Sequence, residues 1–257
     1  MRTYLPLVAF AMACDQGPRP PNPDEIPEMV TVAGSEMTEG YALGIQRRTV
    51  TVDAFRISRM PITVGRWKQC VSVGACAPPE SRAPSCTDAT RTFEAANADA
   101  PVTCVAWQQA VQYCSWQHGA RMPTPAEWLL AARGSRVQRY PWGNAIPNCD
   151  QHPLGVAGKD PVRLCRDPDA AARDAWVVGK HPLGTGESGM TDVLLVPGEL
   201  LTRTKDAQFP GCFGSGACLV RGSAPGAIDG VVSLPKETPT PEVPVYGFRC
   251  VWTGGVP

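Results

Sequence analysis

A helical repeat of apolar residues stands near the middle of the chain, in the segment 101–144. Its first half places apolar side chains at i, i+3, i+4 and i+7, on one stripe of a helix: Trp107, Ala110, Val111 and Cys114. Three glutamines take the opposite, polar side: Gln108, Gln109 and Gln112. The pattern predicts an amphipathic helix that ends at Gly119, because glycine readily closes a helix.

The second half carries the signals for the start and the end of another helix. Thr124 can accept a backbone N–H as N-cap, Pro125 fits the first turn, and Glu127 completes a capping box. Gly134 ends this helix. Its expected buried face consists of Trp128, Leu129 and Ala132. We expect the two helices to lie against one sheet.

Weaker patterns lie on either side of this pair. β-Branched and polar residues alternate from Arg48 to Ile57, which predicts one half-buried strand. Thr63 caps a short predicted helix, Val64 to Val71, with Trp67 and Val71 on its buried side. The segment Asn148–Lys180 has no readable period, and we expect it to be a surface excursion.

The composition fits one globular domain of mixed class. The chain has 257 residues, 43% hydrophobic and 19% charged, and its 24 Lys and Arg balance 24 Asp and Glu. Neither a basic cluster nor a stripe of basic and aromatic residues is present, so the sequence indicates no nucleic-acid partner. The 27 prolines and 25 glycines predict much loop structure.

The first 14 residues resemble a bacterial lipoprotein signal peptide. Arg2 precedes an apolar run from Leu5 to Ala13, which is shorter than the ~20 residues that span a bilayer. Small residues then lead to Cys14, and acyl chains on Cys14 would anchor the protein stably. We expect a membrane-anchored lipoprotein of the bacterial cell envelope, facing the periplasm or the exterior. An ordinary secretory signal and a misassigned start are the alternatives.

Residues 15–27 are rich in proline and polar residues and carry no apolar pattern. This composition predicts a flexible, partly extended tether. The alternative is an N-terminal arm that packs on the domain.

Two neighbouring motifs carry a family resemblance. Arg121–Gly134, RMPTPAEWLLAARG, and Tyr140–Asn144, YPWGN, are similar to R-L-P-T-E-A-E-W-E-x-A-A-R-G and Y-P-W-G-x. Shorter matches lie at Pro101–Trp107, Tyr113–Trp116 and Tyr246–Cys250. On these residues the chain resembles the formylglycine-generating enzyme, or sulfatase-modifying factor, domain family, as a divergent member.

The resemblance runs from about Met29 to Trp252. It implies the family's fold, a loop-rich α+β domain related to C-type lectins and here stapled by disulfides. The expected organisation is a signal peptide over residues 1–14, a tether over 15–27 and a sulfatase-modifying-factor-like domain over 28–254.

The resemblance also identifies what this chain lacks. In active members two cysteines follow R-G-G-S, bind copper(I) as thiolates and engage the substrate thiol. Here Arg221-Gly222-Ser223 is followed by no cysteine before Cys250, so we expect no catalytic residue and no copper. Glu199 is the remnant of a segment that helps to bind structural calcium in the family. It stands among Leu and Val, so we expect that site to be lost, with a helix-end or hydrogen-bonding role as the alternative.

Ten of the eleven cysteines lie in the predicted domain, an even number that suits disulfides in an oxidising compartment. The resemblance implies a bond between Cys114 and Cys250. Proximity along the chain suggests three pairs and leaves a fourth: Cys70–Cys76, Cys149–Cys165, Cys212–Cys218 and Cys86–Cys104. Neither the cysteines nor the three scattered histidines have the spacing of a zinc site, and His118 suits a helix end.

Three functional hypotheses follow. The missing chemistry favours a non-catalytic extracytoplasmic domain that binds a protein or a glycan, with the membrane as a further partner through the lipid anchor. The alternative is copper-dependent oxidation of a substrate cysteine to formylglycine, for which Cys212 and Cys218 would have to replace the missing pair. The third is an iron-dependent sulfoxide synthase, whose iron-binding histidines come from another domain.

Overall fold

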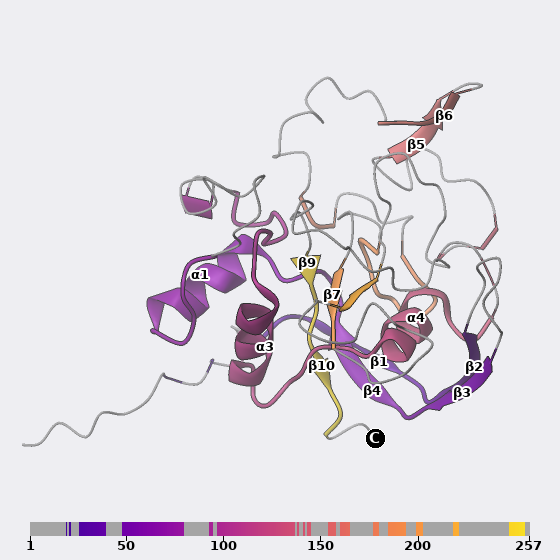
Figure 1. Cartoon of the computed structure of the whole chain (residues 1–257), viewed down its shortest axis with the longest axis horizontal. Coiled ribbons are helices and arrows are strands. Elements are labelled where there is room, and N and C mark those ends of the chain that lie inside the picture. The colour runs from indigo at the N-terminus through magenta and orange to yellow at the C-terminus, as the bar shows by residue number, and fades with distance from the viewer. Residues whose placement is uncertain are drawn as a thin grey trace, which may run out of the picture.

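The computed structural model of the chain describes residues 19, 21, 26–39, 48–79, 93–94, 97–136, 138, 141, 143–144, 154–157, 160–164, 177–179, 185–193, 199–202, 218–220 and 247–254. Within these residues, three helices and ten short strands in four small sheets form a mixed α+β domain (Figure 1). Long connections join the regular elements. The predicted fold class, α+β and rich in loops, is confirmed.

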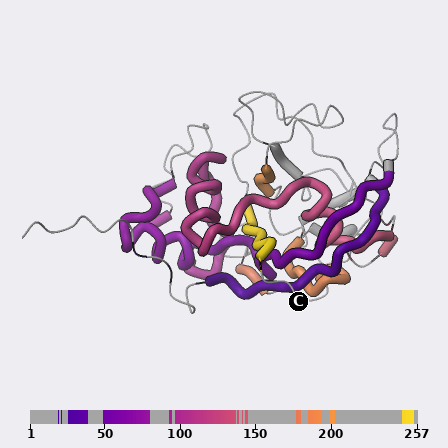
Figure 2. The backbone as a smooth tube through the Cα atoms, turned by 90° about the horizontal axis from the view of Figure 1, so that it is seen from below, coloured from indigo at the N-terminus to yellow at the C-terminus, as the bar shows by residue number. Residues whose placement is uncertain are grey.

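A long antiparallel ribbon forms the N-terminal part of the domain. β1 (Met29–Val32) pairs with β4 (Phe55–Ser58), and β2 (Ser35–Glu39) pairs with β3 (Arg48–Val52). The register is unchanged between the two pairs, because Val32 faces Phe55 and Ser35 faces Val52. Figure 2 shows the two runs side by side as indigo and violet tubes.

The single strand predicted over Arg48–Ile57 is wrong, because the ribbon breaks at Asp53 and Ala54. Gly34 lies opposite this break. A Cβ on Gly34 would come within 2.9 Å of the Ala54 nitrogen and 3.0 Å of the Val52 oxygen, so the two backbones pass too close for a side chain. The alternation of residues continues through the break and therefore does not reveal it.

The end of the chain enters two different sheets. β10 (Val251–Trp252) pairs with the free edge of β4 and completes a sheet of order β1-β4-β10. β9 (Gly247–Phe248) runs parallel to β7 (Glu199–Leu201), whose other edge pairs with β8 (Cys218–Val220). The last strands therefore join the ribbon to the centre of the domain.

A hairpin occupies part of the segment that we expected to be a surface excursion. β5 (Leu154–Ala157) pairs with β6 (Asp160–Leu164), and only Gly158 and Lys159 separate them. A two-residue link that begins with glycine is a known hairpin signal, which the sequence analysis missed.

The three helices begin and end close to their predicted positions. Thr63 accepts the Arg66 amide at 3.3 Å and caps α1 (Val64–Ser72). α3 covers Trp107–Trp116, and α4 covers Pro125–Arg133 with the predicted capping box of Thr124 and Glu127. Gly134 ends α4 with a φ of 71°, a value that favours glycine.

Two apolar clusters divide the core. The first packs α4 against the ribbon, around the fully buried Trp128. The second joins α1, α3 and β9 through an aromatic group in which Trp67 stacks on Tyr113 at 5.4 Å and Phe248 meets both rings edge-on. α3 and α4 belong to different clusters, yet both contact β7: the Trp107 indole donates to the Leu201 carbonyl and the Trp128 indole to the Glu199 carboxylate.

The N-terminal arm, which we define as residues 15–27, contacts the domain at three described positions. Trp116 donates its indole N–H to the Arg19 carbonyl at 2.8 Å, and the His118 ring lies 3.1 Å from the Pro21 carbonyl. Pro21 is buried, and Ile26 packs against the second cluster. At these positions the arm packs on the domain, which was the alternative to the flexible tether, and two of the contacts use backbone carbonyls, which leave no pattern in the sequence.

Candidate functional site: a buried arginine network and an open groove

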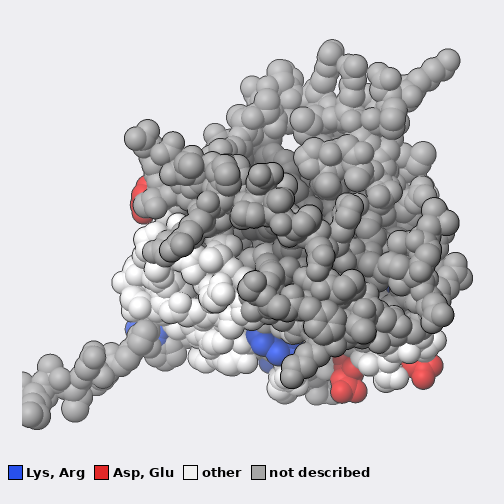
Figure 3. All heavy atoms as spheres, viewed as in Figure 1, with Lys and Arg blue, Asp and Glu red and all other residues white. Residues whose placement is uncertain are grey.

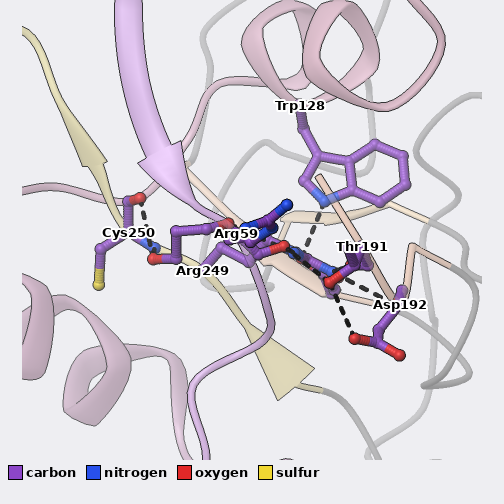
Figure 4. A network of polar contacts seen from close by, with 8 residues as sticks. Arg59, Trp128, Thr191, Asp192, Arg249 and Cys250 are labelled. Atoms are coloured by element: carbon purple, nitrogen blue, oxygen red, sulfur yellow. Dashed lines mark hydrogen bonds and ion pairs between the residues drawn. The ribbon is translucent and has the colours of Figure 1, made fainter. Parts of the chain in front are cut away.

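Arg249 lies at the centre of a polar network in which its whole guanidinium is used (Figure 4). Its Nε donates to both carboxylate oxygens of Glu199, at 2.9 and 3.1 Å. Nη1 donates to the carbonyls of Ser58 and Arg59, and Nη2 to those of Thr191 and Asp192. Four separate stretches of the chain meet at this one side chain.

Glu199 is fully enclosed by donors. Besides Arg249, the Trp128 indole donates to its Oε2 at 2.8 Å, and both Glu199 and Arg249 have 0% exposure. Glu199 is the first residue of β7 and its carboxylate accepts hydrogen bonds. Of the two alternatives to a calcium ligand, a helix-end role and a hydrogen-bonding role, the structure therefore shows the second. Oxygens already engaged by a cation and an indole are a poor ligand set for calcium, which needs several free oxygens.

Asp192 extends the network towards a second loop. It has a φ of 55°, and its Oδ2 accepts from the Gly179 amide at 2.9 Å and from the Thr191 hydroxyl at 3.0 Å. Its Oδ1 is buried without a hydrogen-bond partner among the described residues. The side chain thus fixes the turn that presents two carbonyls to Arg249.

The network lies where the two apolar clusters meet. Leu200 belongs to the second cluster and Leu201 to the first, and these residues follow Glu199 directly. Likewise Phe248 and Cys250 belong to the second cluster, while Val251 belongs to the first. We conclude that the Glu199–Arg249 pair is a polar joint that sets the position of one cluster against the other.

An open groove of about 350 Å³ lies between the break of the ribbon at Asp53 and Ala54 and the start of α4. It is lined by Thr51, Val52, Asp53, Ala54, Arg121, Thr124, Ala126, Glu127 and Thr253. Arg121 and Glu127 form a two-pronged ion pair on its wall, with Arg121 Nη1 donating to Glu127 Oε2 at 2.8 Å. Glu127 also accepts the Thr124 amide at 2.8 Å.

Arg121 and Glu127 neutralise each other in this groove. Burial raises the pKa of the Glu127 carboxyl, but the hydrogen bonds from Arg121 and Thr124 and the charge of Arg121 outweigh it and hold that pKa below its usual value. The same hydrogen bond raises the pKa of Arg121. Because Glu127 already neutralises the start of α4, the groove offers no free helix end to an anion.

The described residues offer little else for chemistry. Within them, no group of three or more His, Cys, Asp or Glu lies close enough to hold a metal ion. On the face in Figure 3, their charged side chains lie singly, most of them towards the lower margin and one acidic group at the upper left edge, and form no extended patch of one sign. The described helices include none that is long and apolar enough to cross a membrane.

The structure places five of the predicted cysteines in disulfides. Cys114 bonds to Cys250 with a Cα–Cα distance of 5.4 Å, which ties α3 to the last strands as the resemblance implies. Cys70 bonds to Cys76 with a Cα–Cα distance of 5.2 Å. Cys104 is also disulfide-bonded.

Several predicted sites lie outside the described residues. They are Cys14 and the cysteines Cys86, Cys149, Cys165 and Cys212, together with the segment after Arg221 that holds the copper ligands in the family. Of Cys218, the structure describes the backbone at the start of β8. The pairs Cys149–Cys165, Cys212–Cys218 and Cys86–Cys104 stay predictions.

The sequence analysis missed most of the polar network. Arg249 and Trp128 stood inside recognised motifs, but we assigned Trp128 only to an apolar face and gave Arg249 no role. No local signal marked Arg249, because in an extended segment a residue between two neighbours that face the core points to the opposite face. Nothing in the sequence indicates that its partner is Glu199.

Comparison with known proteins gives a family and several relatives. The family described as "Sulfatase-modifying factor enzyme 1-like domain" matches residues 16–167, more than half of the chain. Hercynine oxygenase of Mycolicibacterium smegmatis is 30% identical over 181 residues, which cover 57% of this chain and 42% of that protein. Inactive C-alpha-formylglycine-generating enzyme 2 of Bos taurus is 53% identical over 50 residues, 19% of this chain and 16% of that protein.

The chain spans less than half the length of these curated relatives. Among solved structures, that of PvdO from Pseudomonas aeruginosa is similar to this chain with a TM-score of 0.58 and 18% sequence identity. The superposition covers 88% of this chain and 94% of the PvdO chain. At that identity the likeness concerns the fold alone. The family match begins at residue 16, within the N-terminal arm that contacts α3.

Proposed function

Because the chain belongs to the sulfatase-modifying factor enzyme 1-like domain family, we propose that it is a non-catalytic member that binds a protein or a glycan. This proposal rests on the bonding state of Cys250. Only Cys250 follows Arg221 in the sequence, and Cys250 is fully buried in its bond to Cys114. No thiol remains in that part of the chain to bind copper or attack a substrate.

The residues present do not fit the family's metals. Copper(I) prefers thiolates, and the residues from Ala224 to Pro235 include none. For calcium, the one remaining carboxylate, Glu199, is taken up by Arg249 and Trp128. We therefore derive no step through either metal.

The site of action that we propose is the bacterial cell envelope. The support is the short apolar segment that ends at Cys14, together with disulfides of the kind that persist in oxidising compartments. Replacing Cys14 by Ser should move the protein from the membrane fraction to the soluble fraction. Wild-type protein found in the cytoplasm with Met1 intact would refute the anchor.

The lack of catalysis can be tested directly. The purified chain is incubated with copper(I), oxygen and a peptide that carries a Cys-x-Pro-x-Arg motif, and formylglycine is sought by mass spectrometry beside an active enzyme as control. We expect no product. Formylglycine formed at a rate that Cys212→Ala or Cys218→Ala abolishes would show that these cysteines have replaced the missing pair.

An oxygenase is the second candidate, because of the similarity to hercynine oxygenase over 57% of the chain. The alignment covers only 42% of that relative, so more than half of it has no counterpart in the match. Oxygen consumption with hercynine, a thiol and iron(II) would distinguish the two candidates: turnover supports the oxygenase, and its absence supports the binding domain.

A further inference from the structure

The end of α3 holds two points of the N-terminal arm by their main-chain carbonyls. The Trp116 indole donates to the Arg19 carbonyl at 2.8 Å, and the His118 Nε2 lies 3.1 Å from the Pro21 carbonyl. Donors two residues apart on the domain thus meet acceptors two residues apart on the arm. In Figure 1 the described positions of the arm lie beside the lower end of α3.

The backbone at this point is shaped for the contact. His118 has a φ of 53°, in the left-handed region that a residue with a Cβ seldom adopts, and Gly119 follows with a φ of 73°. An unfavourable conformation of this kind persists only where surrounding contacts fix it. Here the residue in this conformation places its imidazole on the Pro21 carbonyl, two residues along the arm from the carbonyl that the Trp116 indole binds.

The arm has the composition that such a pair of donors recognises. Prolines stand at positions 18, 20, 21 and 23. A proline-rich segment is extended before it binds, has few N–H groups and offers its carbonyls outward. Domains that recognise such segments combine aromatic surfaces with hydrogen-bond donors to those carbonyls. Here Trp116 and His118 supply the two aromatic rings and the contacts to the Arg19 and Pro21 carbonyls, and Pro21 is buried.

We infer that Trp116 and His118 form a recognition site for a proline-rich extended peptide, and that the N-terminal arm is its resident ligand. The site is independent of the proposed absence of catalysis. A ligand that is joined to its site by a short segment of the same chain acts at an effective concentration in the millimolar range. A proline-rich segment of another protein must therefore compete with the arm for the same two donors.

Limited proteolysis of the purified full chain tests the docking. Glu25 is the first glutamate of the chain, so a glutamyl endopeptidase releases the arm by cutting after it. Trp116→Phe removes the indole donor, and His118→Asn replaces the imidazole with a residue that tolerates the left-handed region. Each should speed this cut about two- to tenfold, the effect of one net hydrogen bond.

Trp107→Phe is the matched control. It also removes an indole donor from α3, but that indole bonds to the Leu201 carbonyl at 2.8 Å, away from the arm. Its cleavage rate at Glu25 should equal that of wild type, and unchanged near-ultraviolet circular dichroism should show that all three variants are folded. Equal rates at Glu25 for wild type, Trp116→Phe and His118→Asn would overturn the inference.

Competition separates recognition from simple packing. A synthetic peptide of residues 16–23, QGPRPPNP, is added to the wild-type chain at millimolar concentrations. We expect it to speed cleavage after Glu25 with a saturable dose dependence, while the same peptide with its four prolines changed to alanine has no effect. If the variants speed cleavage but the peptide does not, the arm is only packed and the recognition site is refuted.

Discussion

Replacing Arg249 by Met tests whether the polar joint holds the two apolar clusters in place. Methionine keeps an unbranched side chain but removes the charge and every donor. The Glu199 carboxylate, which has 0% exposure, would keep only the Trp128 indole among its described partners. A buried charge would therefore remain without a counter-charge.

The magnitude follows from the contacts. Removing one partner of a buried ion pair costs about 3–5 kcal/mol. Arg249 also donates to the carbonyls of Ser58, Arg59, Thr191 and Asp192. In the variant, the Arg59 carbonyl would still accept from the Thr191 amide. Counting only one of the other three carbonyls as left without a donor adds about 1–3 kcal/mol, so the sum is a lower limit. The loss of about 4–8 kcal/mol is comparable with the whole stability of a domain, about 5–15 kcal/mol.

Urea unfolding with the disulfides intact, followed by circular dichroism, measures this loss. Glu199→Gln is the milder partner variant, because glutamine keeps the shape and one acceptor while Arg249 keeps its four carbonyls. In the double variant the two losses should overlap, with a coupling energy above about 1 kcal/mol. The reasoning fails if Arg249→Met lies within about 1 kcal/mol of wild type or if the two losses simply add.

Three further predictions concern separate features. The Cys114–Cys250 bond joins residues 136 apart, so replacing both cysteines by Ala should lower the unfolding free energy by about 5 kcal/mol. The Cys70–Cys76 bond joins residues only 6 apart, and the same replacement there should cost about 2 kcal/mol. Urea midpoints of the two paired Ala variants measure the difference. Glu127 has a lowered pKa in the folded state, so its contribution is complete above the unfolded value of about 4.3 and is lost as the pH falls through the folded value. Thermal melts should therefore show a shallower loss of stability on acidification for Glu127→Gln than for wild type. Gly34→Ala should cost about 1–3 kcal/mol, because its Cβ would meet backbone atoms of Val52 and Ala54, whereas Gly254→Ala, whose Cβ meets nothing, should melt as wild type does.

The parts of the fold that could be predicted are those fixed by neighbours in the chain. The capping box of α4 joins Thr124 to Glu127 three residues later, and Gly134 ends the helix through its own conformation. The family resemblance supplied the one long-range pair that was predicted, Cys114 with Cys250. These signals need no knowledge of how distant segments pack.

The parts that could not be predicted depend on distant segments or on the backbone. Arg249 takes partners 50 to 191 residues away, and no local pattern records such pairings. The break of the ribbon depends on the approach of Gly34 to Ala54 across two strands. The two hydrogen bonds to the arm go to carbonyls, which every residue possesses, so the sequence does not indicate where on the domain the arm lies.

The position of Arg249 near the end of the chain has a consequence for biosynthesis. Residues 247–252 supply two strands, the cation of the joint and one half of the long disulfide. Both clusters include residues of this segment, so neither is complete until it has been synthesised. We therefore expect a chain that is cut before Arg249 to lose the ion pair and the long disulfide together, and not to reach the folded state.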